Sequence, residues 1–232
     1  KNYLRVFTDP TFVHALWYTA LFTVVSVLTI NVFAFTIAML LTKGIRGTNV
    51  FRTVFFMPNL IGGIVLGYIW QILLNGILAN FGKTLTYSSS YGFWGLIVLM
   101  NWQQIGYMMI IYIAGIQNIP GELIEAAKMD GAGRMRQIFS ITLPLMKTII
   151  SLNFILTVSG LLKSNLDQTL VLMNSQNQVR AEVIDSYVYR MGMTQGDFSY
   201  ATAVGLGVSV VSVILLVTAN KITGKINEES VL

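Results

Sequence analysis

The sequence predicts an all-α membrane protein with five transmembrane helices. Hydrophobic residues make up 54% of the chain and charged residues only 11%, and the mean hydropathy is +0.67. Soluble domains average about 25% charged residues. The apolar residues fall into five runs, each long enough to cross a hydrocarbon core of about 30 Å. The cations gather in the loops between these runs, mostly in alternate ones, as the positive-inside rule leads us to expect.

The first two predicted helices cover residues 13–41 and 50–74. In the first helix, three hydroxyl side chains share one face, which we expect to pack against other helices. They are Thr19, Thr23 and Ser26. In the second helix, Pro58 should produce a kink, because proline lacks the N–H that the helix needs. Gly63 and Gly67 lie four residues apart, so another helix can approach closely there.

The third predicted helix covers residues 93–116 and carries a polar, aromatic patch. The patch consists of Trp102, Gln103, Gln104 and Tyr107. Polar side chains are costly in a bilayer unless they face other helices or a wet cavity. We therefore expect this patch to face away from lipid.

The fourth predicted helix covers residues 145–162 and carries a polar stripe. Asn153, Thr157, Gly160 and Ser164 recur at intervals of four, three and four residues. This spacing keeps one face of a helix in register. The stripe is therefore expected to point at something other than lipid.

The fifth predicted helix covers residues 200–220 and is preceded by a shorter one. Residues 183–192 are expected to form a short helix lying at the membrane surface. In the fifth helix, Ala201, Gly205 and Ser209 make a small-residue stripe at a spacing of four. Such stripes are typical of faces between transmembrane helices.

Residues 119–144 form a polar connection that predicts a helix, a turn and a second helix. Pro120 suits a helix start, because its missing N–H would be unpaired in the first turn. Glu122 and Glu125 sit where a helix N-terminus favours anions. Gly131 should end the first helix, since glycine adopts left-handed caps without strain. The second helix is amphipathic, with Ile138, Phe139 and Ile141 apolar, Arg134 and Arg136 exposed, and Pro144 opening the next apolar run.

The order of residues in this connection resembles the EAA motif of ABC importer permeases. Glu125-Ala126-Ala127, then Gly131, then Ile141-x-Leu143-Pro144 match it in register. The longer phrase EAAKMDGAGRMRQIFSITLPLM is similar to the carbohydrate-uptake branch, which includes the maltose and glycerol-phosphate permeases. The resemblance implies a coupling loop seated in a cleft of an ATPase subunit. Its implied ATPase-coupling residues are Glu125, Ala126, Ala127, Asp130, Gly131, Ile141, Leu143 and Pro144. The alternative is an ordinary amphipathic connection between two spans.

The resemblance covers nearly the whole chain, through phrases such as FRTVFFMPNL and GDFSYATAVGL. It implies a single transmembrane permease domain over residues 1–232, with the EAA coupling loop at 119–144 inside it. Family members carry one more helix ahead of the position of Asn2 and Tyr3, so we expect a truncated chain here and six helices in the full one. Residues 174–176 read Asn-Ser-Gln, where relatives often have Gly-Gly-Pro. The implied location is the bacterial cytoplasmic membrane, crossed several times.

The resemblance also implies a function and a set of partners. The chain would be the permease subunit of an ATP-driven importer, moving a sugar or oligosaccharide by alternating access, or alternatively a non-sugar solute. Expected partners are a second permease subunit in a heterodimer, two ATPase subunits, an extracytoplasmic substrate-binding protein and the lipid bilayer, but no nucleic acid. ATP and Mg²⁺ would be bound by the ATPases. No cofactor, metal or catalytic residue is expected on this chain, which lacks cysteine and a Walker-type phosphate loop.

Two other function classes fit the residues less well. A proton-coupled transporter usually needs an ionisable group within the membrane, and no acid lies in the middle of a predicted helix. The only histidine, His14, lies at the edge of the first helix. An intramembrane hydrolase would need a base near Ser159, and none is at hand.

The distribution of cations predicts the topology. Nine lysines and arginines lie on one side and six on the other, and the nine lie in the shorter connections. The nine are Lys43, Arg46, Arg52, Lys128, Arg134, Arg136, Lys147, Lys221 and Lys225. The positive-inside rule places residues 119–144 in the cytoplasm. The first residue should therefore lie outside, and the C-terminus in the cytoplasm.

The resemblance to the maltose branch also implies a substrate path. Substrate contacts in that branch come from the helices before and after the EAA loop. Counted from Glu125, those positions are Gln103, Gln104, Tyr107, Thr157, Gly160, Leu161 and Ser164. Only Tyr107 clearly keeps the family's residue type, and it can stack on a sugar face. We therefore expect a sugar other than maltose. The alternative is that this patch packs against the partner permease.

Overall fold

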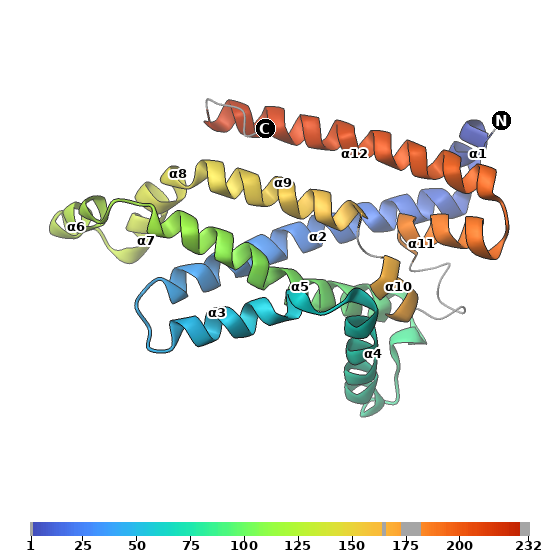
Figure 1. Ribbon diagram of the computed structural model, residues 1–232, viewed down its shortest axis with the longest axis horizontal. Helices are drawn as coiled ribbons and strands as arrows, with labels where there is room; N and C mark the ends of the chain where they lie inside the picture. Colours follow the sequence, from blue (N-terminus) through green and yellow to red (C-terminus); the bar gives the residue numbers. More distant parts are fainter. Residues whose placement is uncertain (1, 164–165, 173–181, 228–232) are drawn as a thin grey trace.

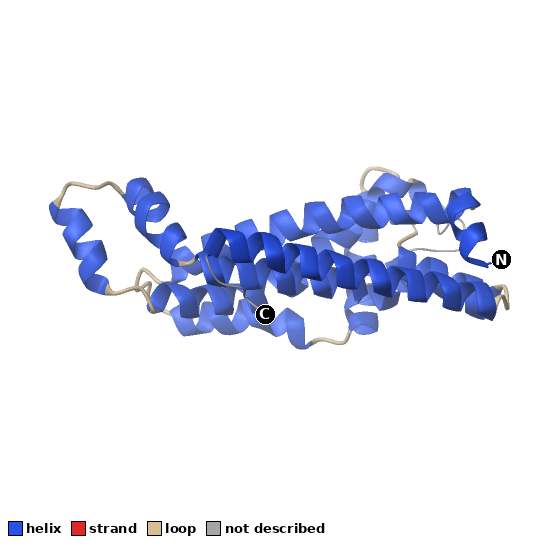
Figure 2. Cartoon of the chain, turned by 90° about the horizontal axis from the view of Figure 1, so that it is seen from above, coloured by secondary structure: helices blue, strands red, loops and turns tan. Residues whose placement is uncertain are grey.

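The computed structural model describes residues 2–163, 166–172 and 182–227. Among these residues every regular element is a helix. Figures 1 and 2 show four long helices running side by side: α2 (Pro10–Leu41), α5 (Ser89–Gln117), α9 (Lys147–Lys163) and α12 (Phe198–Asn227). In the described ranges, three helices are long and apolar enough to cross a membrane alone, and two bent pairs raise the number to five. The predicted all-α membrane class is confirmed.

The centre of the bundle lies between α2 and α5. Asp9 caps α2, because its Oδ1 accepts a hydrogen bond from the backbone N–H two residues later at 2.9 Å, and Pro10 follows at the first helical position. The predicted face of hydroxyl side chains on α2 is buried: Thr19, Thr23 and Ser26. The fully buried apolar side chains of this core include Phe22, Ile30, Leu96, Leu99 and Met109.

The second predicted helix is broken rather than kinked. It consists of α3 (Thr48–Phe56), a tight turn η1 (Met57–Leu60) that contains Pro58, and α4 (Gly63–Ala79). Ile61 and Gly62 have extended backbone angles, so helical hydrogen bonding stops there, and the chain bends by 105°. As a result α4 projects sideways from the bundle (Figure 1).

The two glycines of α4 accommodate a close neighbour, as predicted. A Cβ at Gly67 would lie 3.0 Å from the Cβ of Val171, and one at Gly63 would lie 3.0 Å from Nε2 of Gln168. Both neighbours belong to α10 (Leu166–Leu172), a short helix packed against α4. A tight turn η2 (Leu85–Tyr87) leads from α4 towards α5.

The fourth predicted helix begins two residues late, after a bend. The connection between α5 and α9 contains α6 (Gly121–Met129), α7 (Arg134–Gln137), the π-helical turn η3 (Ile138–Thr142) and α8 (Leu143–Leu145). The axis then turns by 73° at Met146, which has non-helical backbone angles and is 1% exposed. A buried side chain at the bend holds the two segments at this angle.

The segment at 183–192 is helical, as predicted, and it packs against other helices of the chain; its location at the membrane surface stays a prediction. It forms α11 (Ile184–Tyr189) and the start of a π-helical turn η4 (Arg190–Thr194), and α11 packs against both α2 and α12 while running along the bundle (Figure 1). Ile184, Tyr187 and Met191 form a second core with α1 (Asn2–Thr8) and the start of α12. The spacing of these three residues puts them on one helical face, which is why the segment is buried.

The small-residue stripe of α12 packs only at its start. Ala201 is buried, whereas Ser209 is exposed, and a Cβ at Gly205 would meet no atom within 4 Å. The predicted face between helices is therefore confirmed only for its first residue. Residues 174–176, where the sequence departs from the family pattern, lie outside the described residues.

Candidate coupling and substrate sites

The first arm of the predicted helix–turn–helix is α6, which has a defined end. Gly131 has a φ of +73°, a left-handed conformation that favours glycine. Its N–H donates to the carbonyl of Lys128 at 3.0 Å, and the N–H of Ala132 donates to the carbonyl of Ala127 at 2.9 Å. These two bonds form a Schellman motif, which satisfies the last carbonyls of the helix. The turn is therefore held by its backbone.

The second arm is built from three short helical segments, α7, η3 and α8, rather than one helix. The Gln137 Nε2 donates to the carbonyl of Ala132 at 2.7 Å and ties this arm to the turn. At the other end of the arm, Thr142 and Met146 are buried against the bundle. Both arms project beyond the long helices at the loop end of the molecule, as we call the end that carries α6 and α7 (Figures 1 and 2).

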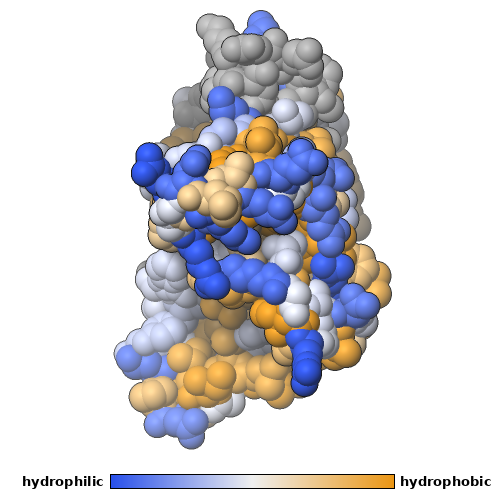
Figure 3. All heavy atoms as spheres, turned by 90° about the vertical axis from the view of Figure 1, so that its left-hand side faces the viewer, coloured by the Kyte–Doolittle hydropathy of each residue, from blue (hydrophilic) through white to orange (hydrophobic). Residues whose placement is uncertain are grey.

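The predicted coupling residues are mostly accessible. Glu125, Ala126, Asp130, Gly131 and Pro144 are exposed, and Ala127, Ile141 and Leu143 are half-buried. Figure 3 shows many hydrophilic side chains on this end of the molecule, with apolar ones between them. Three large apolar side chains in the same stretch are also exposed: Met129 at 89%, Met135 at 64% and Phe139 at 62%. Exposed apolar side chains with a polar rim mark an interaction surface.

The two methionines were not identified from the sequence as part of this surface. Each sits alone among polar residues in a short helix, where apolar periodicity cannot separate a buried side chain from an exposed one. The exposed cations Lys128, Arg134 and Arg136 lie in the same stretch. The surface can therefore offer apolar and cationic contacts together.

The structure places the predicted substrate residues of α5 at different depths. Gln103 is 8% exposed, and its Oε1 accepts a hydrogen bond from Nε2 of Gln168 on α10 at 3.2 Å. Gln104 is half-buried. Tyr107, one turn closer to the loop end, is 39% exposed. Trp102 packs edge-to-face against Trp70 of α4, with ring centroids 5.5 Å apart.

The predicted substrate residues of α9 are divided between the interior and the surface. Thr157 is 3% exposed and accepts a hydrogen bond from Nδ2 of Asn31 at 3.2 Å, while Asn31 Oδ1 accepts one from Tyr112 at 2.7 Å. Leu161 is buried in the main core, and Gly160 is exposed. In this conformation the chain's own helices cover Thr157 and Leu161.

The polar stripe on α9 therefore faces other helices in part, as predicted. Asn153 is fully buried, and its Nδ2 donates to the carbonyl of Met108 on α5 at 3.3 Å. The stripe does not form one open surface, because Asn153 and Thr157 are buried while Gly160 is exposed. Ser164 lies outside the described residues.

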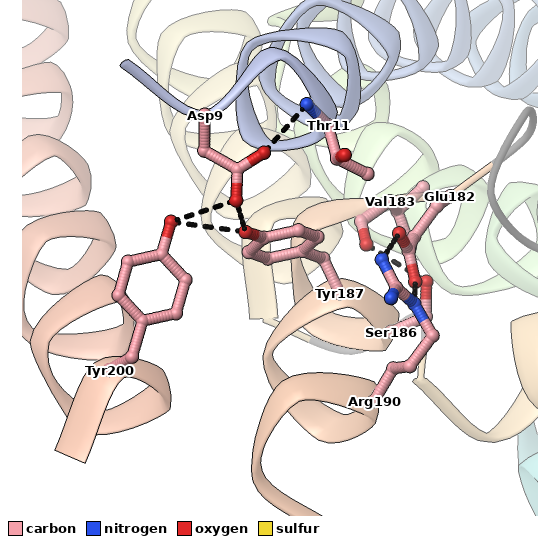
Figure 4. Close-up of polar contacts among 8 residues, drawn as sticks. All are labelled: Asp9, Thr11, Glu182, Val183, Ser186, Tyr187, Arg190 and Tyr200. Carbon is pink, nitrogen blue, oxygen red and sulfur yellow. Dashed lines mark hydrogen bonds and ion pairs between the residues drawn. The ribbon is translucent and has the colours of Figure 1, made fainter. Parts of the chain in front are cut away.

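The sequence did not predict a polar cluster at the opposite end of the molecule, which we call the N-terminal end (Figure 4). Tyr187 and Tyr200 both point at Asp9, and each hydroxyl donates to its Oδ2, at 2.8 and 3.3 Å. Beside them, Nε and Nη2 of Arg190 donate to the two carboxylate oxygens of Glu182 at 2.8 and 2.7 Å. The Glu182 side chain is only 1% exposed.

Hydrogen bonding keeps the groups of this cluster in fixed charge states. Burial alone would raise the pKa of Asp9, but hydrogen bonds from Tyr187 and from backbone N–H groups outweigh it and hold that pKa below its ordinary value. The hydrogen bond to Glu182 raises the pKa of the Arg190 guanidinium. Burial raises the pKa of Tyr187 as well. The cluster therefore combines one carboxylate held by neutral tyrosines with one bidentate ion pair.

Together, the candidate spans and the projecting helical connection define a helical membrane protein with an exposed loop at one end. The chain belongs to the family described as binding-protein-dependent transport system inner membrane component, whose model matches residues 12–225. It is therefore an inner-membrane component of a transport system.

Two relatives and one solved structure place the chain within this family. The probable starch degradation products transport system permease protein AmyD of Thermoanaerobacterium thermosulfurigenes is 33% identical over 95% of this chain and 80% of its own. The polygalacturonan/rhamnogalacturonan transport system permease protein YteP of Bacillus subtilis strain 168 is 33% identical over 100% of this chain and 76% of its own. The fold matches a bacterial alginate ABC transporter, solved in complex with an alginate pentasaccharide-bound periplasmic protein. That match has a TM-score of 0.88 and 22% identity, over 99% of this chain and 84% of that one.

Proposed function

We propose that this chain is the permease subunit of an ATP-driven importer that moves an oligosaccharide into the cell by alternating access. Its family and the names of its relatives support this, since the relatives include permeases for starch degradation products and for pectic saccharides. A permease for a non-sugar solute is the alternative. The observation that carries the coupling role is the projecting loop, rigid in its backbone and exposed in its side chains.

The loop is suited to transmit movement from an ATPase. The backbone cap at Gly131 and the bond from Gln137 to Ala132 limit internal bending. A rigid loop seated in a partner moves with it, whereas a flexible one absorbs the displacement. Met129 and Met135 would enter apolar pockets, and Glu125 lies on the exposed surface of α6 for a polar contact. ATP and Mg²⁺ would be bound by the ATPase subunits.

The proposed assembly contains two permeases, two ATPases and an extracytoplasmic binding protein. The loop end carries Lys43, Arg46, Lys128, Arg134 and Arg136, which fits a cytoplasmic location. The N-terminal end would then face outside, towards the binding protein. The C-terminal end of α12 lies towards the loop end, so it would approach the cytoplasm (Figure 1).

Tyr107 gives the test of the substrate path. In the complex with its native partners, reconstituted in proteoliposomes, Tyr107→Ala should lower ATP-dependent sugar uptake roughly fivefold to tenfold, as expected for losing one aromatic contact. Tyr107→Phe should retain most uptake. Ile110→Ala is the matched control, because Ile110 is equally exposed one turn along the same helix. A maltotriose probe and an oligogalacturonate probe cover a neutral and an acidic saccharide.

The outcomes separate the alternatives. Wild-type uptake in Tyr107→Ala, or loss only through failed assembly, would support packing against the partner permease. ATP-dependent uptake of neither probe by the wild-type complex would count against both of these saccharide classes. Uptake of an amino acid in their place would support the non-sugar alternative.

A further inference from the structure

The short helix α10 covers the substrate path on the side of the N-terminal end. The fourth span follows α9 as far as Lys163, and α10 then packs across α4 and α5 before α11 resumes the direction of the bundle (Figure 1). Leu172 and Thr169 of α10 are each 1% exposed. This helix is therefore inserted among the others rather than lying on them.

The short helix α10 packs closely on α4 because two residues of α4 at the contact are glycines, which carry no side chain. A Cβ at Gly63 would lie 3.0 Å from Nε2 of Gln168, and one at Gly67 would lie 3.0 Å from Cβ of Val171. Gln71, one turn further along α4, donates from Nε2 to the carbonyl of Val171 at 2.7 Å. The contact between α4 and α10 is therefore close. Among the described residues it consists of this one hydrogen bond and van der Waals contacts.

The contact of α10 with α5 is polar and incompletely satisfied. The amide of Gln168 donates to Gln103 at 3.2 Å, and both side chains are more than nine-tenths buried. In the part of the chain that the structure describes, the Oε1 of Gln168 and the Oγ1 of Thr169 are buried and have no hydrogen-bond partner. Buried polar atoms without partners favour any conformation that gives them one. An arrangement with α10 lifted from α5 would do so.

The side chains of α5 become more exposed within one helical turn from Gln103 towards the loop end. Gln103 is sealed under α10, whereas Tyr107, on the same face four residues later, is 39% exposed. Because α5 runs towards the loop end, the predicted path is covered at Gln103 and uncovered at Tyr107.

We propose that α10 is the outer seal of the substrate path, and that Gln168 is a further sugar-binding residue that Gln103 hides in this conformation. The proposal rests on the proposed function, since it assumes that the path carries a saccharide. When α10 separates from both α4 and α5, the amides of Gln103 and Gln168 become free. An amide both donates and accepts hydrogen bonds, which suits the hydroxyl groups of a sugar. The coupling loop continues through α8 and α9 to α10, so one chain segment joins the ATPase contact to the seal.

The first experiment measures access to Gln168 without requiring the sugar. In the reconstituted complex, Gln168→Cys is labelled by a membrane-impermeant thiol reagent from outside, with and without ATP trapped by vanadate. Labelling should rise at least about tenfold on trapping, because the outward-open state becomes the populated one. The controls are Thr194→Cys, at a residue exposed at the N-terminal end of this structure, and Ser212→Cys, at a buried one; neither is expected to change on trapping.

Two results would overturn different claims. Unchanged labelling at position 168, while Tyr107→Cys changes its accessibility, would refute the seal and leave alternating access intact. Unchanged labelling at both positions would refute the alternating-access mechanism itself.

A disulfide tests the seal in a second way. Gly67→Cys with Val171→Cys places two Cβ atoms within a small shift of the 3.5–4.5 Å that a disulfide needs. The wild-type chain contains no cysteine, so the pair is free of competitors. Oxidation should stop ATP-dependent uptake and reduction should restore it, with the single variants unaffected by oxidant. A fully cross-linked complex that transports at the wild-type rate would refute the seal.

The sugar-binding role of Gln168 has its own measurement. Gln168→Leu keeps a similar size but removes both hydrogen-bonding groups, so the apparent affinity for the transported saccharide should fall about tenfold. The substitution Gln103→Leu should give a similar loss. Unchanged affinity in Gln168→Leu would refute the binding role, while the labelling and disulfide results would still decide the seal.

Discussion

The two ends of this molecule use their polar residues in opposite ways. At the N-terminal end, both ion pairs found among the described residues join elements of the chain itself: Arg5 with Asp197, and Arg190 with Glu182. At the loop end, Lys128, Arg134 and Arg136 are exposed, and backbone hydrogen bonds with one side-chain bond from Gln137 hold the turn.

This difference indicates which charges serve the fold and which serve a partner. The Glu182 carboxylate is buried and bidentate, so its interactions are satisfied within the chain. The cations of the coupling loop are exposed, as are Met129 and Met135 in the same stretch, and in the proposed function these side chains contact the ATPase.

The two ends should lie on opposite sides of the membrane. In intact cells, Thr194→Cys at the N-terminal end should react with an impermeant thiol reagent, and Ser140→Cys in the coupling loop should react only after permeabilisation. Both residues are exposed in the structure, and the parent chain has no cysteine. The expected difference is all or none. Labelling at 140 with protection at 194 would reverse the proposed orientation.

Removing one partner of the buried ion pair should give the largest loss of stability. Arg190→Ala leaves the Glu182 carboxylate buried and unpaired, which is expected to cost about 3–5 kcal/mol. Thermal unfolding of the purified complex measures this loss. Arg136→Ala, at an exposed cation of the coupling loop, should leave the unfolding temperature nearly unchanged. Equal effects of the two variants would contradict the contrast between the ends.

The coupling loop should fail in function rather than in folding. Gly131→Pro forces φ near −65° where the structure has +73°, and it removes the N–H bonded to Lys128. The local strain is about 1–3 kcal/mol. The protein should reach the membrane in normal amounts, while substrate-stimulated ATP hydrolysis of the complex is lost. Gly133→Ala is the control, since residue 133 has an ordinary φ of −64°.

Glu125→Lys tests the same loop through charge. Glu125 lies beyond the first turn of α6, which holds only Glu122, so the helix dipole acts on it weakly. A cation on this exposed surface would instead reverse the charge of the expected contact with the ATPase. The variant should resemble Gly131→Pro. Full substrate-stimulated ATP hydrolysis in both variants would show that the loop has no coupling role.

Local sequence rules predicted the coupling loop because its information is local. The helix end at Gly131 depends on backbone conformation, and glycine at that position is a sufficient indication. The break after Pro58 was predicted only as a kink, because the local sequence does not specify the whole of the backbone change. Proline indicates a disturbed helix, but it does not specify the extended backbone at Ile61 and Gly62, where the chain bends by 105° and α4 then packs against α10.

The N-terminal end escaped prediction because its contacts join distant parts of the chain. Asp9 and Tyr200 are separated by 191 positions. Nothing near Tyr187 in the sequence indicates a carboxylate partner, so its segment was predicted to lie at the membrane surface. The placement of Thr157 depends likewise on Asn31, far away on α2.

The smallest change in stability is expected from removing the charge of Asp9. Its pKa is lower in the folded chain than in the unfolded one, so its contribution to stability is present above the unfolded pKa of about 3.9 and is lost as pH falls through the folded value. Asp9→Asn should lower the unfolding temperature at neutral pH by an amount equivalent to less than about 1 kcal/mol, because water still reaches the carboxylate. The gap from wild type should close as pH falls below the folded pKa of Asp9. Asp130→Asn, at an exposed position of the coupling loop, should show no gap at any pH. A gap for Asp9→Asn that persists in acid would mean that Asp9 stabilises the N-terminal end through its shape and not through its charge.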